Sequence, residues 1–139
     1  MIFVDTGFFF ALASEKDPDH ARVLEVWQSL RGRRLSELLV TTNHVLMECI
    51  TLTRVRISHQ AAVVMGERLY SEKMAQIHWA TPEDERAAFE YLKKHRDKEY
   101  STVDCLSFVV MDKLGISEAL AVDDDFTHRF VTRPGPPKG

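Results

Sequence analysis

The chain lacks the features that mark secreted and membrane proteins. Only two of its 139 residues are cysteine, and no run of 18 apolar residues occurs. The N-terminus has no basic stretch followed by an apolar segment and a cleavage site. Because small secreted domains commonly rely on disulfides, and a membrane-spanning helix needs about 20 apolar residues, we expect a cytoplasmic protein outside the membrane.

The two cysteines occupy similar positions. Cys49 directly follows Glu48, and Cys105 directly follows Asp104. Free cysteines usually behave as small buried hydrophobic side chains, and we expect that here. A redox link between the two thiols is the alternative.

Several catalytic patterns are also missing. The sequence has no Gly-rich phosphate-binding loop and gives no support for Ser-His-Asp chemistry. The formal net charge of −3 is too small to identify a partner. Basic residues nevertheless gather in three groups, which form either a cationic rim for a phosphodiester substrate or ordinary solvated helix faces. The groups are Arg31, Arg33 and Arg34; Arg54 and Arg56; and Lys93, Lys94, Arg96 and Lys98.

Short apolar runs alternate with segments of helical periodicity. We expect strands at residues 2–5, 38–41, 75–79 and 118–122, an edge strand at 130–132, and helices at 8–13, 21–30, after 42–43, at 58–71, from 81 and at 101–115. This alternation predicts an α/β fold: a three-layer α/β/α sandwich with a central, mostly parallel sheet of four to five strands. We expect one domain over residues 1–132 and a disordered tail over 133–139, which is rich in Pro and Gly.

Four acids stand in apolar surroundings and form the main functional signal. Asp5 and Asp123 directly follow predicted strands, where ligands bind in open α/β sheets. Glu48 borders the apolar stripe of its helix, and Asp104 lies in the first turn of another. Two like charges about 4 Å apart cost about 4 kcal/mol at an effective dielectric near 20, and a divalent cation removes that cost. The four acids therefore predict a metal site.

Each acid also has a simpler interpretation. Asp5 is suitable as a helix N-cap, and Glu48 as the partner of a nearby arginine. Asp104 fits a capping box with Ser101, although capping and metal binding are compatible. Within the run from Asp123 the first acid is the candidate ligand, while Asp125 either caps the next turn or supports the site.

The donor atoms indicate the class of metal. Oxygen ligands favour Mg²⁺ or Mn²⁺, as one or two ions, whereas zinc prefers histidine or thiolate. His44 and Glu48 are spaced i and i+4, and we expect this histidine to be a supporting or surface residue.

Four segments together resemble the acidic motifs of the PIN domain family, in order and over residues 2 to about 131. They are Ile2-Phe-Val-Asp5-Thr-Gly-Phe-Phe, Thr42-Asn-His-Val-Leu-Met-Glu48, Ser101-Thr-Val-Asp104-Cys-Leu-Ser-Phe and Ala119-Leu-Ala-Val-Asp123-Asp-Asp-Phe126. The resemblance implies a PIN-like fold and a Mg²⁺- or Mn²⁺-dependent endoribonuclease. By motif, Asp5, Glu48, Asp104 and Asp123 are its catalytic metal ligands, and Thr6 and Ser101 are supporting polar groups.

The chain's length is similar to that of VapC-type toxins from toxin-antitoxin pairs. This resemblance implies an RNA substrate, a cognate antitoxin protein and a homodimer. The alternatives are a housekeeping PIN nuclease in RNA maturation and a catalytically inactive PIN-like module that binds RNA or protein. A response-regulator-like phosphoacceptor is disfavoured because no suitably placed lysine follows a later strand.

Overall fold

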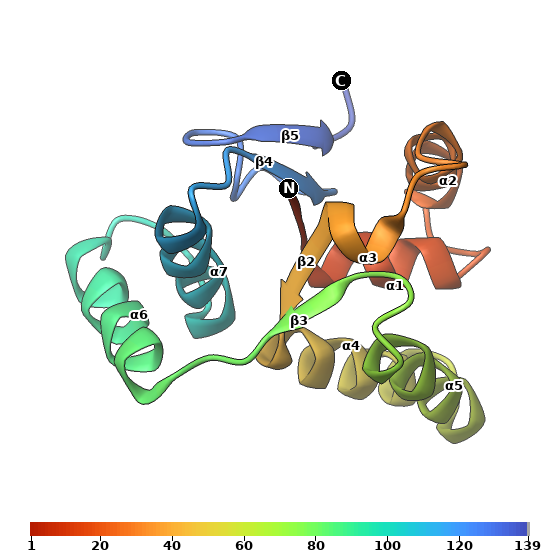
Figure 1. Cartoon of the computed structure of the whole chain (residues 1–139), viewed down its shortest axis with the longest axis horizontal. Helices are drawn as coiled ribbons and strands as arrows, with labels where there is room; N and C mark the ends of the chain where they lie inside the picture. Colours follow the sequence, from red (N-terminus) through yellow and green to blue (C-terminus); the bar gives the residue numbers. More distant parts are fainter. Residues whose placement is uncertain (139) are drawn as a thin grey trace.

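The computed structural model describes residues 1–138, in which a five-stranded sheet forms the centre (Figure 1). Its strand order is β3-β2-β1-β4-β5, and every neighbouring pair is parallel. The strands are β1 (Ile2–Val4), β2 (Leu39–Thr42), β3 (Gln76–His78), β4 (Glu118–Ala121) and β5 (Val131–Pro134). The expected parallel α/β fold is confirmed.

Helices cover both faces of this sheet. Figure 1 shows α6 and α7 on one side and α1, α2, α4 and α5 on the other. The helices are α1 (Thr6–Ala13), α2 (His20–Ser29), α3 (Leu35–Leu38), α4 (Asn43–Arg56), α5 (His59–Tyr70), α6 (Pro82–Lys94) and α7 (Thr102–Leu114). The order of the strands changes direction between β3 and β4, so right-handed crossovers place the later helices on the opposite face. This is the expected three-layer sandwich.

The core explains why the central strands are apolar throughout. Phe3 and Val4 of β1 are fully buried because helices lie on both faces of the sheet. On the α7 face, the ring of Phe108 meets that of Phe126 edge to face, with centroids 4.9 Å apart. These contacts fix the strand ends that carry the acids.

Two boundaries differ from the sequence-based expectation. The short helix α3 precedes β2, so Leu38 belongs to a helix rather than to the expected strand. The strand β5 continues through Pro134, so the expected tail begins inside the sheet: the Gly135 N–H donates to the Ala121 carbonyl at 2.9 Å, and Arg22 donates to the Gly135 carbonyl at 2.9 Å. Proline is tolerated there because β5 is an edge strand. None of the helices in the described residues is long and apolar enough to cross a membrane.

Candidate active site

Two of the four acids follow adjacent strands at the carboxyl end of the sheet. Asp5 follows β1 directly and Asp123 follows β4 after one residue. The Asp5 N–H donates to the Leu120 carbonyl at 3.0 Å, which ties the two strand ends together. From here the chain passes from β1 towards β2 on one side and from β4 to β5 on the other. Such a switch point is where open α/β sheets bind ligands.

Asp5 is buried without the partners that a structural carboxylate normally has. It occupies the N-cap position of α1, yet its side chain makes no capping hydrogen bond. The residue is only 4% exposed, and its Oδ1 atom has no hydrogen-bond partner. Burial raises the pKa of Asp5 well above its usual value, and the charges of Asp104 and Asp123 raise it further. The capping interpretation therefore does not account for Asp5.

Thr6 and Cys49 are neighbours of Asp5 in the structure. The Thr6 hydroxyl is buried and also lacks a hydrogen-bond partner. The Cys49 thiol lies 3.9 Å from the Thr6 carbonyl, and burial, followed by the charge of Asp5, raises its pKa. Both cysteines are free and buried, which confirms the expected role as small core residues.

Asp104 serves as a helix cap and faces the other acids. Its backbone N–H donates to the Ser101 hydroxyl, and its carboxylate accepts from the Ser101 N–H, both at 3.0 Å. Burial raises the pKa of Asp104, and the charges of Asp123 and Glu48 add to that effect, although the Ser101 hydrogen bonds oppose it. Capping and membership of the acidic cluster therefore coexist.

Glu48 is positioned by α4, which the Thr42 side chain caps by accepting from the Val45 N–H at 3.2 Å. No ion pair among residues 1–138 includes Glu48, so pairing with an arginine is not observed. His44 instead contacts Glu85 at 2.8 Å. Glu48 lines a groove of about 640 Å³ between α4 and the start of α7, where Val103 contributes.

The loop after β4 adds a fifth acid to the site. The Asp125 N–H donates to the Asp123 carboxylate at 3.1 Å. Partial burial, followed by the charges of Asp123 and Asp104, raises the pKa of Asp125 to about 6. Asp125 therefore lies in the same electrostatic environment as the four principal acids.

The chemistry of these residues fits a hard divalent cation. In the described part of the chain, no three acidic, histidine or cysteine side chains already stand in metal-holding geometry. The buried oxygens of Asp5 and Thr6 nevertheless have no hydrogen-bond partner, and the surrounding carboxylates repel one another. Because a cation would supply the missing partner and remove the repulsion, this set of oxygen donors fits a hard divalent cation.

Asp84 is a second buried acid, and its negative charge is balanced by hydrogen-bond donors and a lysine. Its partners His78 and Lys113 were not predicted from the sequence. Asp84 lies in the capping box of α6 with Thr81 and is also bound by His78 and Lys113, each at 3.0 Å. Burial alone would raise its pKa, but these hydrogen bonds hold the pKa of Asp84 well below its usual range. The Thr81 motif was visible in the sequence, whereas Lys113 is 29 residues away.

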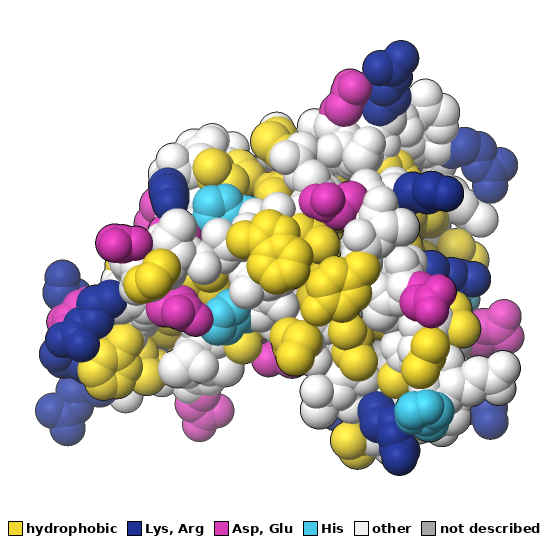
Figure 2. Space-filling view, turned by 60° about the horizontal axis from the view of Figure 1, so that its bottom comes forward, with side chains coloured by type: hydrophobic (Ala, Val, Ile, Leu, Met, Phe, Trp, Pro, Cys, Tyr) yellow, Lys and Arg dark blue, Asp and Glu magenta, His cyan; other side chains and the backbone are white. Residues whose placement is uncertain are grey.

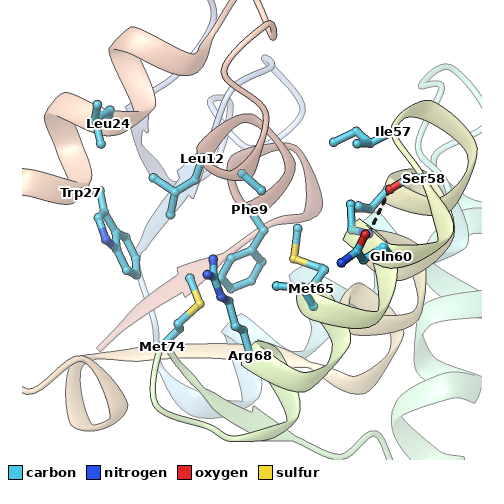
Figure 3. A pocket seen from close by; sticks show the side chains of 14 residues that line it. Phe9, Leu12, Leu24, Trp27, Ile57, Ser58, Gln60, Met65, Arg68 and Met74 are labelled. Carbon is cyan, nitrogen blue, oxygen red and sulfur yellow. Dashed lines mark hydrogen bonds between the residues drawn. The ribbon is translucent and has the colours of Figure 1, made fainter.

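An apolar cavity lies apart from the acids. It measures about 610 Å³ and lies between α1, α2 and α5, where Phe9, Trp27, Met65 and Met74 surround Arg68 (Figure 3). No carboxylate lines it. The acids and this cavity therefore belong to different surfaces.

The family model for the PIN domain matches residues 2–129, nearly the whole chain. The chain belongs to the PIN domain family. This PIN domain is 39% identical over 127 residues to the 23S rRNA-specific endonuclease VapC20 of Mycobacterium tuberculosis, covering 91% of this chain and 92% of the relative.

Solved structures agree with this assignment. The crystal structure of M. tuberculosis VapC20, described as a sarcin-ricin loop cleaving toxin, matches with a TM-score of 0.83 and 37% identity, covering 92% of this chain and 94% of that one. FitAcB from Neisseria gonorrhoeae matches with a TM-score of 0.65, covering 96% and 98%, and its 17% identity shows a shared fold.

Proposed function

We propose that this PIN domain is a divalent-metal-dependent endoribonuclease, the toxin of a toxin-antitoxin pair, and that it cleaves 23S rRNA at the sarcin-ricin loop. The observation that carries the activity is the buried Asp5 carboxylate, whose Oδ1 atom has no hydrogen-bond partner and whose charge interacts with those of three other acids. The substrate is inferred from the similarity to VapC20 over nearly the full length of both chains.

In this proposal the four principal acids hold one or two Mg²⁺ or Mn²⁺ ions. An ion held there would supply the activation of a water molecule and the neutralisation of the phosphate under attack. Thr6 contributes a buried hydroxyl next to Asp5, and Ser101 holds Asp104 in place through two hydrogen bonds. Asp125 supports Asp123 through its backbone N–H.

The activity test uses an Asp5→Asn variant and RNA that carries the sarcin-ricin loop, with Mg²⁺ or Mn²⁺ present. We expect a single cut by the unmodified chain, no cut in EDTA, and a loss of at least 100-fold in the variant. Asp112→Asn is the matched control, because Asp112 is on the same helix as Asp104 but pairs with Arg129 at 2.7 Å. Undiminished metal-dependent cleavage by the Asp5 variant would refute the site assignment.

The partner proposals follow from the same acids. A cognate antitoxin would inhibit by placing an arginine or lysine among the carboxylates, where a positive charge is missing. Growth arrest on expression, relieved by a protein encoded directly upstream and absent for Asp5→Asn, supports the toxin role in the cytoplasm. A housekeeping nuclease would cleave RNA without arresting growth. The proposed homodimer is tested by the mass of the chain in solution.

A further inference from the structure

Two exposed aromatic side chains lie close to the carboxyl end of the sheet, where the acids are. Trp79 is 57% exposed and Tyr70 is 47% exposed. Their ring centroids are 6.4 Å apart and their planes differ by 27°, so the rings form one roughly parallel surface. Figure 2 shows hydrophobic side chains gathered in the middle of one face of the molecule. Contiguous apolar surface of this kind commonly marks a contact site.

The strand register places Trp79 at the same end of the sheet as the acids. Phe3 of β1 pairs with Val40 of β2, and Val40 pairs with Gln76 of β3. Asp5 comes two residues after Phe3, and Trp79 comes three residues after Gln76. Both therefore leave the sheet at its carboxyl end. Since neighbouring strands lie about 4.8 Å apart, β3 is only about 10 Å from β1 along this edge.

The backbone on both sides of Trp79 is fixed, so its exposure does not result from a loose loop. The preceding residue, His78, contacts the Asp84 carboxylate at 3.0 Å. The N–H of the following residue, Ala80, donates to the Asn43 side chain at 2.8 Å. Asn43 is the first residue of α4, the helix that carries Glu48. Trp79 is thus held at a set position relative to a candidate metal ligand.

Met47 links the aromatic rings to the groove that contains Glu48. The Tyr70 hydroxyl donates to the Met47 sulfur at 3.8 Å, and Met47 also lines that groove. Arg56 lines the groove towards the C-terminal end of α4 and supplies a positive charge. An RNA strand lying in the groove would meet Arg56, Glu48 and the rings in sequence.

We propose that Trp79 and Tyr70 form a stacking subsite for an unpaired nucleobase of the RNA substrate, next to the nucleotide that is cut. This proposal rests on the ribonuclease function proposed above. RNA loops expose unstacked bases, which proteins bind on aromatic side chains. Met47 joins the rings to the groove that holds Glu48 and Arg56, so an RNA strand that reaches the acids along this groove passes the rings.

The test measures binding in an Asp5→Asn background, which prevents cleavage, with a stem-loop RNA that carries the sarcin-ricin sequence. We expect Trp79→Ala to weaken binding about tenfold or more, because a stacked base contributes about 1–3 kcal/mol and about 1.4 kcal/mol is a factor of ten. Trp79→Phe, which keeps a ring, should retain most of the affinity. Phe89→Ala is the matched control, since Phe89 is an exposed aromatic residue (48%) on α6 and should not matter.

A second readout reports stacking directly. The chain has two tryptophans, so a Trp27→Phe background leaves Trp79 as the only one. We expect RNA to quench its fluorescence. Unchanged affinity in Trp79→Ala, or unquenched fluorescence with RNA bound, would overturn the subsite. A variant that changes the mass of the chain in solution while binding RNA normally would overturn it too, by assigning the rings to a second copy.

The failure of the proposed function has a different signature. RNA that binds in the Trp79-dependent manner but is not cleaved by the unmodified chain in Mg²⁺ or Mn²⁺ supports the subsite and refutes the nuclease. If the unmodified chain binds no such RNA, both proposals fail.

Discussion

Replacing Asp5 with asparagine should stabilise the metal-free protein while removing its response to metal. The carboxylate is buried, one of its oxygens has no partner, and the neighbouring acids repel it. Since like charges about 4 Å apart cost about 4 kcal/mol at an effective dielectric near 20, loss of one charge should relieve repulsion of that order, reduced by relaxation and solvent. We expect a gain of about 2 kcal/mol in the free energy of unfolding.

The pH dependence has a defined sign. The folded-state pKa of Asp5 is raised, so between the unfolded value near 4 and that raised value the folded protein binds more protons than the unfolded chain. The stability of the metal-free protein should therefore fall as the pH rises through this window. Asp5→Asn should lessen that fall, because the asparagine does not titrate.

Thermal unfolding in EDTA and in Mg²⁺ tests both points. A gain of about 2 kcal/mol corresponds to roughly 7 °C in Tm for a chain of this size. Metal at 100 times its Kd should stabilise the unmodified protein by about 2.7 kcal/mol and the variant by much less. A variant that is less stable in EDTA, with equal metal responses in both proteins, would show that Asp5 is a structural residue.

Three further changes separate metal binding from folding. Asp104→Asn should change the free energy of unfolding in urea by no more than about 1 kcal/mol, since asparagine also caps helices. The same variant should reduce metal-dependent cleavage at least 100-fold, and activity equal to that of the unmodified chain would refute the catalytic role of Asp104. Asp84→Ala should lower that free energy by roughly 3 kcal/mol, because α6 loses its capping box and both His78 and Lys113 lose a partner. It should also flatten the loss of stability at acid pH, and an unchanged urea midpoint would contradict this. Gly7→Ala should lower the free energy of unfolding by about 1–3 kcal/mol and reduce cleavage, since its Cβ would meet Val122, the neighbour of Asp123, at 2.7 Å. Full activity with an unchanged Tm would show that the structure relaxes around this contact.

Sequence patterns predicted the fold well where local rules decide the structure. The apolar run before Asp5 is a buried parallel strand, Thr42 caps α4, and Ser101 forms the expected capping box. The predicted strand boundaries at Leu38 and Pro134 were wrong, because hydrogen bonds to distant segments decide where strands begin and end. The bond from the Gly135 N–H to the Ala121 carbonyl is an example.

Contacts between distant residues could not be predicted. The sequence pattern placed Trp79 inside a strand, yet β3 ends one residue earlier and the side chain is exposed. Nothing in the local sequence of Asp84 indicated that Lys113 would reach it. Periodicity identifies the buried face of an element, but it does not identify which element from elsewhere in the chain will cover that face.

The two capping boxes provide a built-in comparison within one molecule. Thr81 with Asp84 and Ser101 with Asp104 begin neighbouring helices with the same reciprocal hydrogen bonds. At Asp84 the protein supplies Lys113 as the counter-charge, so this carboxylate stabilises the fold. At Asp104 no cation comes from the described chain, and the charge stays available to something from outside. Under the proposed function, the same motif therefore stabilises the fold where the protein supplies the counter-charge, and binds the metal where it does not.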